Sequence, residues 1–173
     1  MLIAMAGLPG TGKSTIAGLI GARIRAAVVS VDPIESAILT AGIDDDQPTG
    51  LAAYLVAETL AESVLDAGQS IIVDAVNAVG PARDQWVELA RRQGTELRFV
   101  EVFCSDADLH RTRLAARKRD LPRLAEPTWH AVEQSLEDYA EWTGQSAEVR
   151  RVTLDTSQPV TANVDAALAF LAS

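Results

Sequence analysis

Residues 7–15, GLPGTGKST, have the types and spacing that bind a polyphosphate. They contain the pattern GxxxxGK[ST], whose glycines let the backbone approach closely while its N–H groups converge on the phosphates. In this pattern Lys13 reaches the β- and γ-phosphates, the Ser14 hydroxyl holds Mg²⁺, and Thr15 is placed to donate to the α-phosphate. The pattern predicts a nucleotide-binding loop made of Gly7, Leu8, Pro9, Gly10, Thr11, Gly12, Lys13, Ser14 and Thr15.

The segments on either side of this loop are those that a phosphate loop requires. Residues 2–6 form a short apolar run that predicts a buried strand. After the loop, apolar residues recur at helical spacing, at Ile16, Leu19, Ile20 and Ile24. A helix that begins near residue 12 adds the positive end of its dipole to the anion site. This strand–loop–helix order makes a chance glycine turn the weaker interpretation.

Two aspartates at the ends of other apolar runs are candidates for catalysis and metal binding. Asp74 closes the β-branched run 71–73, where such an aspartate binds Mg²⁺ directly or through water. Asp32 follows the run 27–31, where a carboxylate could accept a proton from an acceptor hydroxyl or orient it. Asp32 also has a structural interpretation as a helix N-cap, with Pro33 at the first helical position and Glu35 as its capping partner.

A basic segment occupies residues 110–123, which hold six of the fifteen basic residues of the chain: Arg111, Arg113, Arg117, Lys118, Arg119 and Arg123. Arg113 and Arg117 are four residues apart, a spacing that predicts one helix face. The structural alternative is a solvated cationic helix end. In an acidic chain we favour a lid over about 110–127, whose Arg113 and Arg117 neutralise charge on the transferring phosphoryl group.

Several other residues have both a functional and a structural interpretation. Asn77 either donates to a phosphate or acceptor, or makes a turn, and Arg83 could reach an anionic acceptor. Tyr54 is expected to be core or to line the acceptor pocket, and the acidic run Asp44–Asp46 to be solvated. Core packing is expected for Trp86 and for an apolar stripe on a helix from 127 to 142: Trp129, Val132, Leu136 and Tyr139.

The alternation of strand and helix patterns predicts the fold class. Expected strands are 2–6, 27–31, 70–74, 97–104 and 151–155, with helices between them. This order predicts a single α/β domain over residues 1–173, a five-stranded parallel sheet with helices on both faces. Ligands bind at the carboxyl ends of such strands. The loop at 156–159 is therefore expected to lie where an adenine ring rests.

Composition excludes several classes of function. The net charge of −9 disfavours a long nucleic-acid footprint. The single cysteine, Cys104, allows no internal disulfide and is expected to be a buried structural thiol. The two histidines, His110 and His130, have no metal-ligand partner in sequence. No apolar run reaches the ~18 residues of a membrane span, and no secretory leader is indicated, so we expect a cytoplasmic protein.

These residues resemble the small P-loop kinases of the polynucleotide-kinase, zeta-toxin and chloramphenicol-phosphotransferase group. The resemblance covers nearly the whole chain and rests on GLPGTGKST, VSVDPI, IIVDAVN, HRTRLAAR and the turn at 155–159. It implies a P-loop kinase fold in which Asp32 is the base, Asp74 helps to organise magnesium, and Arg113 and Arg117 are the lid arginines. The segments 35–60 and 77–90, which would contact the acceptor, are where these families diverge.

The sequence therefore predicts an ATP-dependent kinase that transfers the γ-phosphoryl group, with Mg²⁺, to a hydroxyl of a small molecule, nucleoside or nucleotide. The alternative is an ATPase or regulatory switch without such an acceptor. A GTPase switch would carry DxxG after the third strand and NKxD for guanine, whereas Asp74 is followed by Ala-Val-Asn and no NKxD occurs. The acceptor and the oligomeric state stay open.

Overall fold

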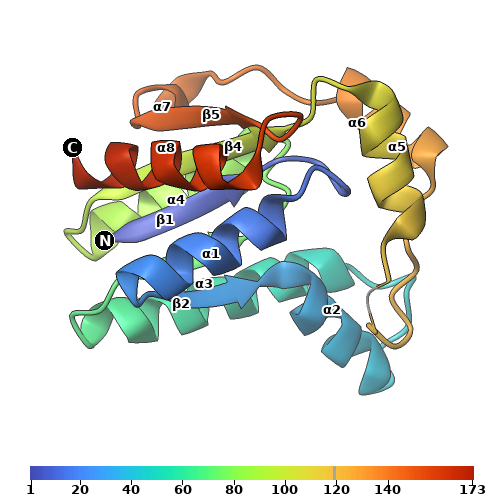
Figure 1. The fold of residues 1–173 in the computed structure, drawn as a ribbon. Helices are drawn as coiled ribbons and strands as arrows, with labels where there is room; N and C mark the ends of the chain where they lie inside the picture. The colour runs from blue at the N-terminus through green and yellow to red at the C-terminus, as the bar shows by residue number, and fades with distance from the viewer. Residues whose placement is uncertain (119) are drawn as a thin grey trace.

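A five-stranded parallel sheet forms the centre of the computed structural model, which describes residues 1–118 and 120–173. The strand order is β2-β3-β1-β4-β5, and every neighbouring pair is parallel (Figure 1). The strands are β1 (Leu2–Ala6), β2 (Ala27–Ser30), β3 (Ile71–Asp74), β4 (Leu97–Phe103) and β5 (Arg151–Asp155). The sequence prediction of the fold class is confirmed, with strand ends within one residue of those expected.

Helices lie between successive strands and after the last one, and they cover both faces of the sheet. They are α1 (Lys13–Ile24), α2 (Val31–Thr40), α3 (Thr49–Asp66), α4 (Gly80–Arg92), α5 (Ala107–Ala116), α6 (Trp129–Glu137), α7 (Gly144–Ala147) and α8 (Val160–Ala172). Among the described residues, no helix is long and apolar enough to cross a membrane.

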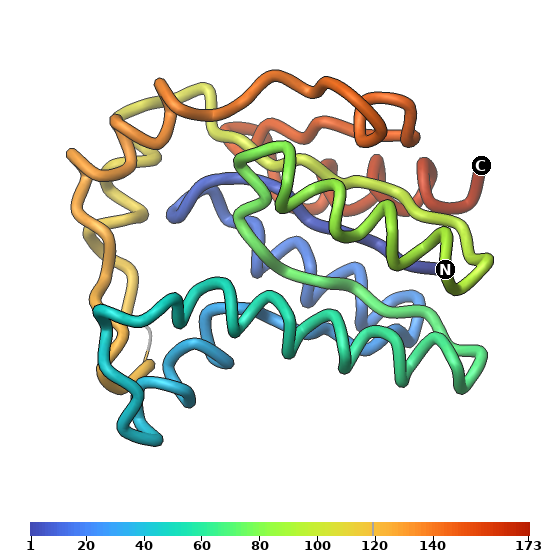
Figure 2. The backbone as a smooth tube through the Cα atoms, turned by 180° about the vertical axis from the view of Figure 1, so that it is seen from behind, coloured from blue at the N-terminus to red at the C-terminus, as the bar shows by residue number. Residues whose placement is uncertain are grey.

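The sheet separates two apolar cores. Because successive side chains of a strand point to opposite faces, Leu2 and Ala4 of β1 pack with residues of α3 and α4, whereas Ile3 and Met5 pack with α1 and α8. In Figure 1, α1 and α8 lie in front of the sheet, and Figure 2 shows α3 and α4 on the opposite side. β1 is buried on both faces, which holds the start of the phosphate loop in a fixed place.

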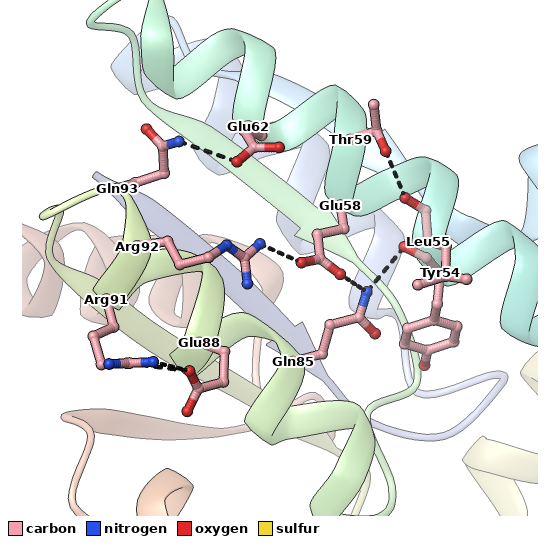
Figure 3. A network of polar contacts seen from close by, with 10 residues as sticks. All are labelled: Tyr54, Leu55, Glu58, Thr59, Glu62, Gln85, Glu88, Arg91, Arg92 and Gln93. Atoms are coloured by element: carbon pink, nitrogen blue, oxygen red, sulfur yellow. Dashed lines mark hydrogen bonds and ion pairs between the residues drawn. The ribbon is translucent and has the colours of Figure 1, made fainter.

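A polar network joins α3 to α4 (Figure 3). Glu58 accepts hydrogen bonds from Arg92 and Gln85, both at 2.6 Å, and Gln85 also donates to the backbone oxygen of Tyr54 at 3.1 Å. Gln93 extends the network to Glu62 at 3.3 Å. These contacts fix the end of α3 that carries Tyr54 against the helix that follows β3.

The carboxyl ends of the strands point toward α2, α5 and α6, which border that side of the molecule (Figures 1 and 2). The expected helix over 127–142 is shorter, because α6 ends at Glu137. Beyond it the chain turns so that Tyr139 and Trp142 donate to Glu101 of β4, at 3.0 and 2.8 Å. The expected apolar stripe is therefore wrong in part: Val132 is buried, but Leu136 is 52% exposed.

Candidate active site

The phosphate loop has the backbone conformation that its glycines allow. Gly7, Gly10 and Gly12 have positive φ angles of 141°, 85° and 88°. A Cβ atom at Gly7 would lie 2.2 Å from the carbonyl oxygen of Val102, so the loop can leave β1 beside β4 only without a side chain there. α1 begins at Lys13, directly after the loop. The strand, loop and helix predicted from the pattern are thus present.

A cavity of about 580 Å³ opens above the phosphate loop. The expected loop residues that line it are Leu8, Pro9, Gly10, Gly12, Lys13, Ser14 and Thr15. Gly7 and Thr11 are not among the residues that line this cavity. Thr11 is buried, and its hydroxyl donates to the backbone oxygen of Leu8 at 2.8 Å.

The remaining walls of this cavity come from segments that are distant in sequence. Asp32 and Val76 line one part of it, and Gln158 and Val160, from the loop and helix after β5, line another. Arg113, Ala116, Arg117 and Thr156 complete the lining. The structure therefore brings Asp32, Arg113 and Arg117 to the same cavity as Lys13 and Ser14, as the sequence predicts.

Lys13 and Asp74 form a buried ion pair below this cavity. The Lys13 ammonium contacts one carboxylate oxygen of Asp74, and the Ser30 hydroxyl donates to the other at 3.0 Å. Asp74 is only 4% exposed, and burial raises the pKa of its carboxyl. The charge and hydrogen bond of Lys13, with hydrogen bonds from Ser14 and Ser30, outweigh burial, so the pKa is lowered overall.

The ion pair of Lys13 and Asp74 predicts how the stability of the fold depends on pH. We expect Lys13→Ala to reverse the direction of this dependence. In the wild type, the lowered pKa of Asp74 stabilises the fold above the ordinary carboxyl pKa, and this contribution is lost as pH falls through the folded value. Without Lys13, we expect burial to dominate and to raise the pKa of Asp74. The contribution of Asp74 to stability would then be present at acid pH and lost as pH rises. We expect denaturant unfolding to show that the free energy of unfolding of Lys13→Ala is about 3 kcal/mol lower than that of the wild type near neutral pH. This difference should shrink toward pH ~4. A difference independent of pH would contradict this prediction.

The residues expected to hold magnesium fit that ion. Ser14 lines the cavity and Asp74 contacts Lys13, so a hydroxyl and a carboxylate, both hard oxygen ligands, lie at its base. Two protein oxygens suit Mg²⁺, which usually keeps several waters and binds substrate phosphates. In the described part of the chain, no group of three or more His, Cys, Asp or Glu side chains could form a metal site by itself.

Asp32 does not cap its helix, which corrects one sequence interpretation. α2 begins two residues earlier than expected, at Val31, so Ser30 is the N-cap and Asp32 lies in the first turn. Its carboxylate is 39% exposed and faces the cavity. The expected capping role of Glu35 is also wrong, because Glu35 accepts a hydrogen bond at 2.9 Å from Thr49 at the start of α3.

The two arginines of the expected lid have different environments. α5 ends at Ala116, and Arg117 is its C-cap in an extended conformation, so the prediction of one shared helix face is wrong. Arg113 donates to the side-chain and backbone oxygens of Thr156, both at 3.0 Å. Arg117 lies 3.5 Å from Asp32 and 3.8 Å from Glu126. Arg119, another residue of the basic segment, lies outside the described residues.

Asn77 and Arg83 are buried structural residues, which corrects their candidate roles at the acceptor. The Asn77 amide donates to the backbone oxygen of Met5 at 2.6 Å and accepts from the Trp86 indole at 2.9 Å. The Arg83 guanidinium donates to four backbone oxygens and lies 4.0 Å from the ring centre of Trp142. The expected turn chemistry of Asn77 and the core packing of Trp86 are confirmed.

Tyr54 contacts the buried cluster of Asn77, Arg83 and Trp86. Its hydroxyl accepts a hydrogen bond at 3.2 Å from the backbone N–H of Asn77. Burial, and then the negative charges of Asp32 and Asp74, raise the pKa of Tyr54. The run Asp44–Asp46 is exposed, as expected for solvated charges. Cys104 is half-buried beyond the end of β4, so the expected buried thiol is wrong in part.

His110 and Thr156 contact the phosphate loop, and sequence reasoning gave neither a role there. His110 of α5 is 3% exposed, with Nε2 at 2.8 Å from the backbone oxygen of Pro9. The Thr156 hydroxyl lies 2.7 Å from the backbone oxygen of Thr11. The only signals for these contacts were indirect: His110 opens the basic segment, and Thr156 follows a strand.

Comparison with known proteins shows the family to which the chain belongs. Residues 2–142 match a protein-family model described as an AAA domain. The chain belongs to this AAA domain family. No curated protein matches the chain.

Solved structures of kinases share the fold of this AAA domain protein. A sugar kinase from Janibacter sp. HTCC2649 is 19% identical with a TM-score of 0.73, over 98% of this chain and 93% of that one. A gluconokinase from Sinorhizobium meliloti 1021 is 21% identical with a TM-score of 0.69, over 98% and 90%. The APS kinase CysC of Mycobacterium tuberculosis, solved with AMPPNP and APS, is 17% identical with a TM-score of 0.67, over 99% and 97%.

Proposed function

We propose that the protein is an ATP-dependent kinase that transfers the γ-phosphoryl group to a hydroxyl of a small molecule or nucleoside. One observation carries this proposal: a single cavity holds the phosphate-loop residues Lys13 and Ser14 together with the carboxylate of Asp32 and the guanidinium groups of Arg113 and Arg117. A nucleotide site alone would not need the carboxylate. In the wall of this cavity, Asp32 supplies a carboxylate that can orient a hydroxyl acceptor and take its proton.

In this proposal the loop N–H groups and Lys13 bind the β- and γ-phosphates, and residues near Gln158 and Val160 receive the adenine. Ser14 and Asp74 would hold Mg²⁺, which offsets phosphate charge when bound. The Lys13 ammonium contacts Asp74 in this structure, and because it has three N–H donors it can also donate to phosphate when the nucleotide enters.

The reaction is an in-line displacement at the γ-phosphorus. The acceptor oxygen forms a bond to phosphorus, the bond from phosphorus to the bridging oxygen of ADP breaks, and the hydroxyl proton passes to Asp32. Arg117 lies 3.5 Å from Asp32 and lines the same cavity as the phosphate loop. It can therefore meet the negative charge that spreads over the transferring group.

The class of acceptor is supported by charge and by the proteins of similar fold. A net charge of −9 disfavours a long nucleic-acid acceptor. The structural neighbours described above are, by name, kinases of sugars, gluconate and APS, which favours a small hydroxyl compound. The likeness to the polynucleotide-kinase and zeta-toxin group stays part of this proposal, as do the single functional domain of residues 1–173 and the lid at about 110–127.

Turnover of ATP with and without a panel of sugars, sugar acids, other alcohols and nucleosides tests this function. A kinase shows a low basal rate that one class of acceptor raises, with one phosphorylated product per ADP formed. Slow hydrolysis that no acceptor changes would contradict the proposal and would favour a nucleotide switch.

Arg117→Ala is expected to lower kcat by about 10²-fold or more while changing the affinity for ATP little. The reason is that Arg117 meets charge that develops during transfer, and such contacts act on the transition state. Arg111→Ala is the matched control, because Arg111 lies on the adjoining helix with its contacts to Glu133 and Trp129 outside the cavity. Steady-state kinetics with nucleotide titrations measure both effects. A change confined to the KM for ATP would make Arg117 a ground-state ligand.

A further inference from the structure

The peptide between Pro9 and Gly10 is held from outside the cavity by His110. The backbone oxygen of Pro9 lies 2.8 Å from Nε2 of His110. A carbonyl oxygen only accepts hydrogen bonds, so Nε2 carries the proton and donates it. The ring is fixed by its edge-on contact with Trp129, at 5.1 Å between centres and an angle of 89°. The direction of this carbonyl is therefore set by α5 and α6, and not by the loop alone.

Fixing this carbonyl also fixes the next amide. No peptide bond among the described residues is cis, and in a trans peptide the C=O and N–H groups point in opposite directions. With the oxygen of Pro9 turned toward His110, the N–H of Gly10 turns away from it, toward the cavity that both residues line. Within residues 1–118 and 120–173, this N–H meets no hydrogen-bond acceptor.

The same arrangement recurs two residues later. The Thr156 hydroxyl lies 2.7 Å from the backbone oxygen of Thr11, which turns the N–H of Gly12 the opposite way. Gly12 also lines the cavity, and its N–H likewise has no acceptor in the described part of the chain. Two side chains outside the loop thus hold alternate carbonyls, and the amides between them face the cavity.

Glycine makes such external control necessary. Gly10, at a φ of 85°, has no Cβ to restrict its backbone, so its preceding peptide can rotate through orientations closed to other residues. In the reversed orientation the Pro9 oxygen would face the phosphates and repel them. A Cβ on Gly10 would lie 3.1 Å from Cδ2 of His110, so the ring sits directly against the peptide that it holds.

We propose that His110 is a positioning residue that orients the Gly10 N–H toward a bound phosphate by holding the Pro9 carbonyl, with Thr156 doing the same for Gly12. This inference rests on the proposed nucleotide site. Orientation before binding removes the cost of ordering the loop when the phosphates arrive. His110 acts through the loop backbone and contacts no phosphate itself.

The test compares His110→Phe with His110→Gln by calorimetric titration with MgADP. Phe keeps a ring against Trp129 but cannot donate, whereas Gln loses the ring but places an N–H near the position of Nε2. We expect Phe to weaken MgADP binding by about 10-fold and Gln to stay within about threefold of wild type. Adenosine, which has no phosphate, should bind all three proteins alike.

Thermal stability separates this role from a structural one. Loss of the ring contact should lower the Tm of His110→Gln more than that of His110→Phe, the reverse of the order expected for MgADP affinity. The inference would be overturned if the MgADP affinities of His110→Phe and His110→Gln ranked in the same order as their Tm values. Thr156→Val repeats the test at Gly12 and decides alone if His110→Phe does not fold. Because Arg113 also donates to the Thr156 hydroxyl, this change is made in Arg113→Ala protein and compared with Arg113→Ala alone, with a similar loss of about 10-fold expected. Wild-type affinity in the folded variants would also overturn it. A wild-type protein that binds no MgADP would overturn the nucleotide site itself.

Discussion

Lys13→Ala is expected to reduce phosphoryl transfer by at least about 10³-fold. The ammonium group lines the cavity, and the loop pattern places it on the β- and γ-phosphates. Its loss leaves charge on the transferring group uncompensated, where single cations in phosphoryl transfer contribute 10³-fold or more. Ser14→Ala should have a large effect of the same kind, since it removes a magnesium ligand, and it leaves the ion pair of Lys13 and Asp74 in place while removing one hydrogen bond to Asp74. Both are measured as acceptor-dependent formation of ADP.

The buried partner of Lys13 requires a stability control. Lys13→Ala leaves the Asp74 carboxylate buried without its cation, so a lost activity could reflect unfolding. The double variant Lys13→Ala/Asp74→Asn has no uncompensated buried charge. We expect its free energy of unfolding to recover while phosphoryl transfer stays near background. Near-normal turnover in a folded Lys13→Ala protein would refute the assignment of the phosphate loop.

Asp32→Asn is expected to lower transfer to the true acceptor by at least about 10²-fold, the lower end of what a general base supplies. An amide cannot take the proton of the attacking hydroxyl, although it has nearly the same shape. Because Asp32 does not cap α2 and its contact with Arg117 is partly exposed, we expect unfolding free energy to change by less than about 1 kcal/mol. Affinity for ATP should also stay close to normal.

The matched control for this change is Glu35→Gln on the same helix. Glu35 receives its hydrogen bond from Thr49 and does not line the cavity, so the control should leave transfer unchanged. Kinetics, ATP titration and melting on one preparation of each protein measure these effects. A stable Asp32→Asn protein that phosphorylates its acceptor at the wild-type rate would remove Asp32 from the mechanism.

Local patterns were enough to predict the sheet and the phosphate loop. β1 is a short apolar run followed by Gly7, and β3 is one that ends at Asp74. The alternation of strands with helices allows few arrangements of a parallel sheet. The loop pattern specifies both backbone and ligand, so Lys13 and Ser14 could be placed from sequence alone. Asp32 and Asp74 followed, since strand ends of such a sheet meet at one edge.

Residues whose partners are distant in sequence could not be predicted in this way. The sequence suggests that Arg83 could reach an anionic acceptor, yet its guanidinium donates to backbone oxygens as far along the chain as Glu141. Asn77 is held by Met5 and Trp86, and His110 reaches Pro9 across a hundred residues of chain. Such contacts depend on how α4, α5 and the segment after α6 pack, which no local pattern specifies.

Helix ends were the other source of error. Asp32 and Pro33 have the residue types of an N-cap and first helical position, but α2 begins at Val31, since the chain turns from β2 directly into the helix. Arg117 has the spacing of α5 but lies at its C-cap. In both cases a shift of one or two residues in a helix end changed the position of a side chain that lines the cavity.

Mass spectrometry of a metabolite mixture incubated with the protein and MgATP tests the central claim most directly, because it asks for the product and assumes no acceptor. The kinase proposal predicts that one class of hydroxyl compound gains a single phosphate in step with ADP formation, and that the product is absent with Lys13→Ala. Formation of ADP and free phosphate with no phosphorylated compound, in a mixture that covers sugars, sugar acids and nucleosides, would contradict it.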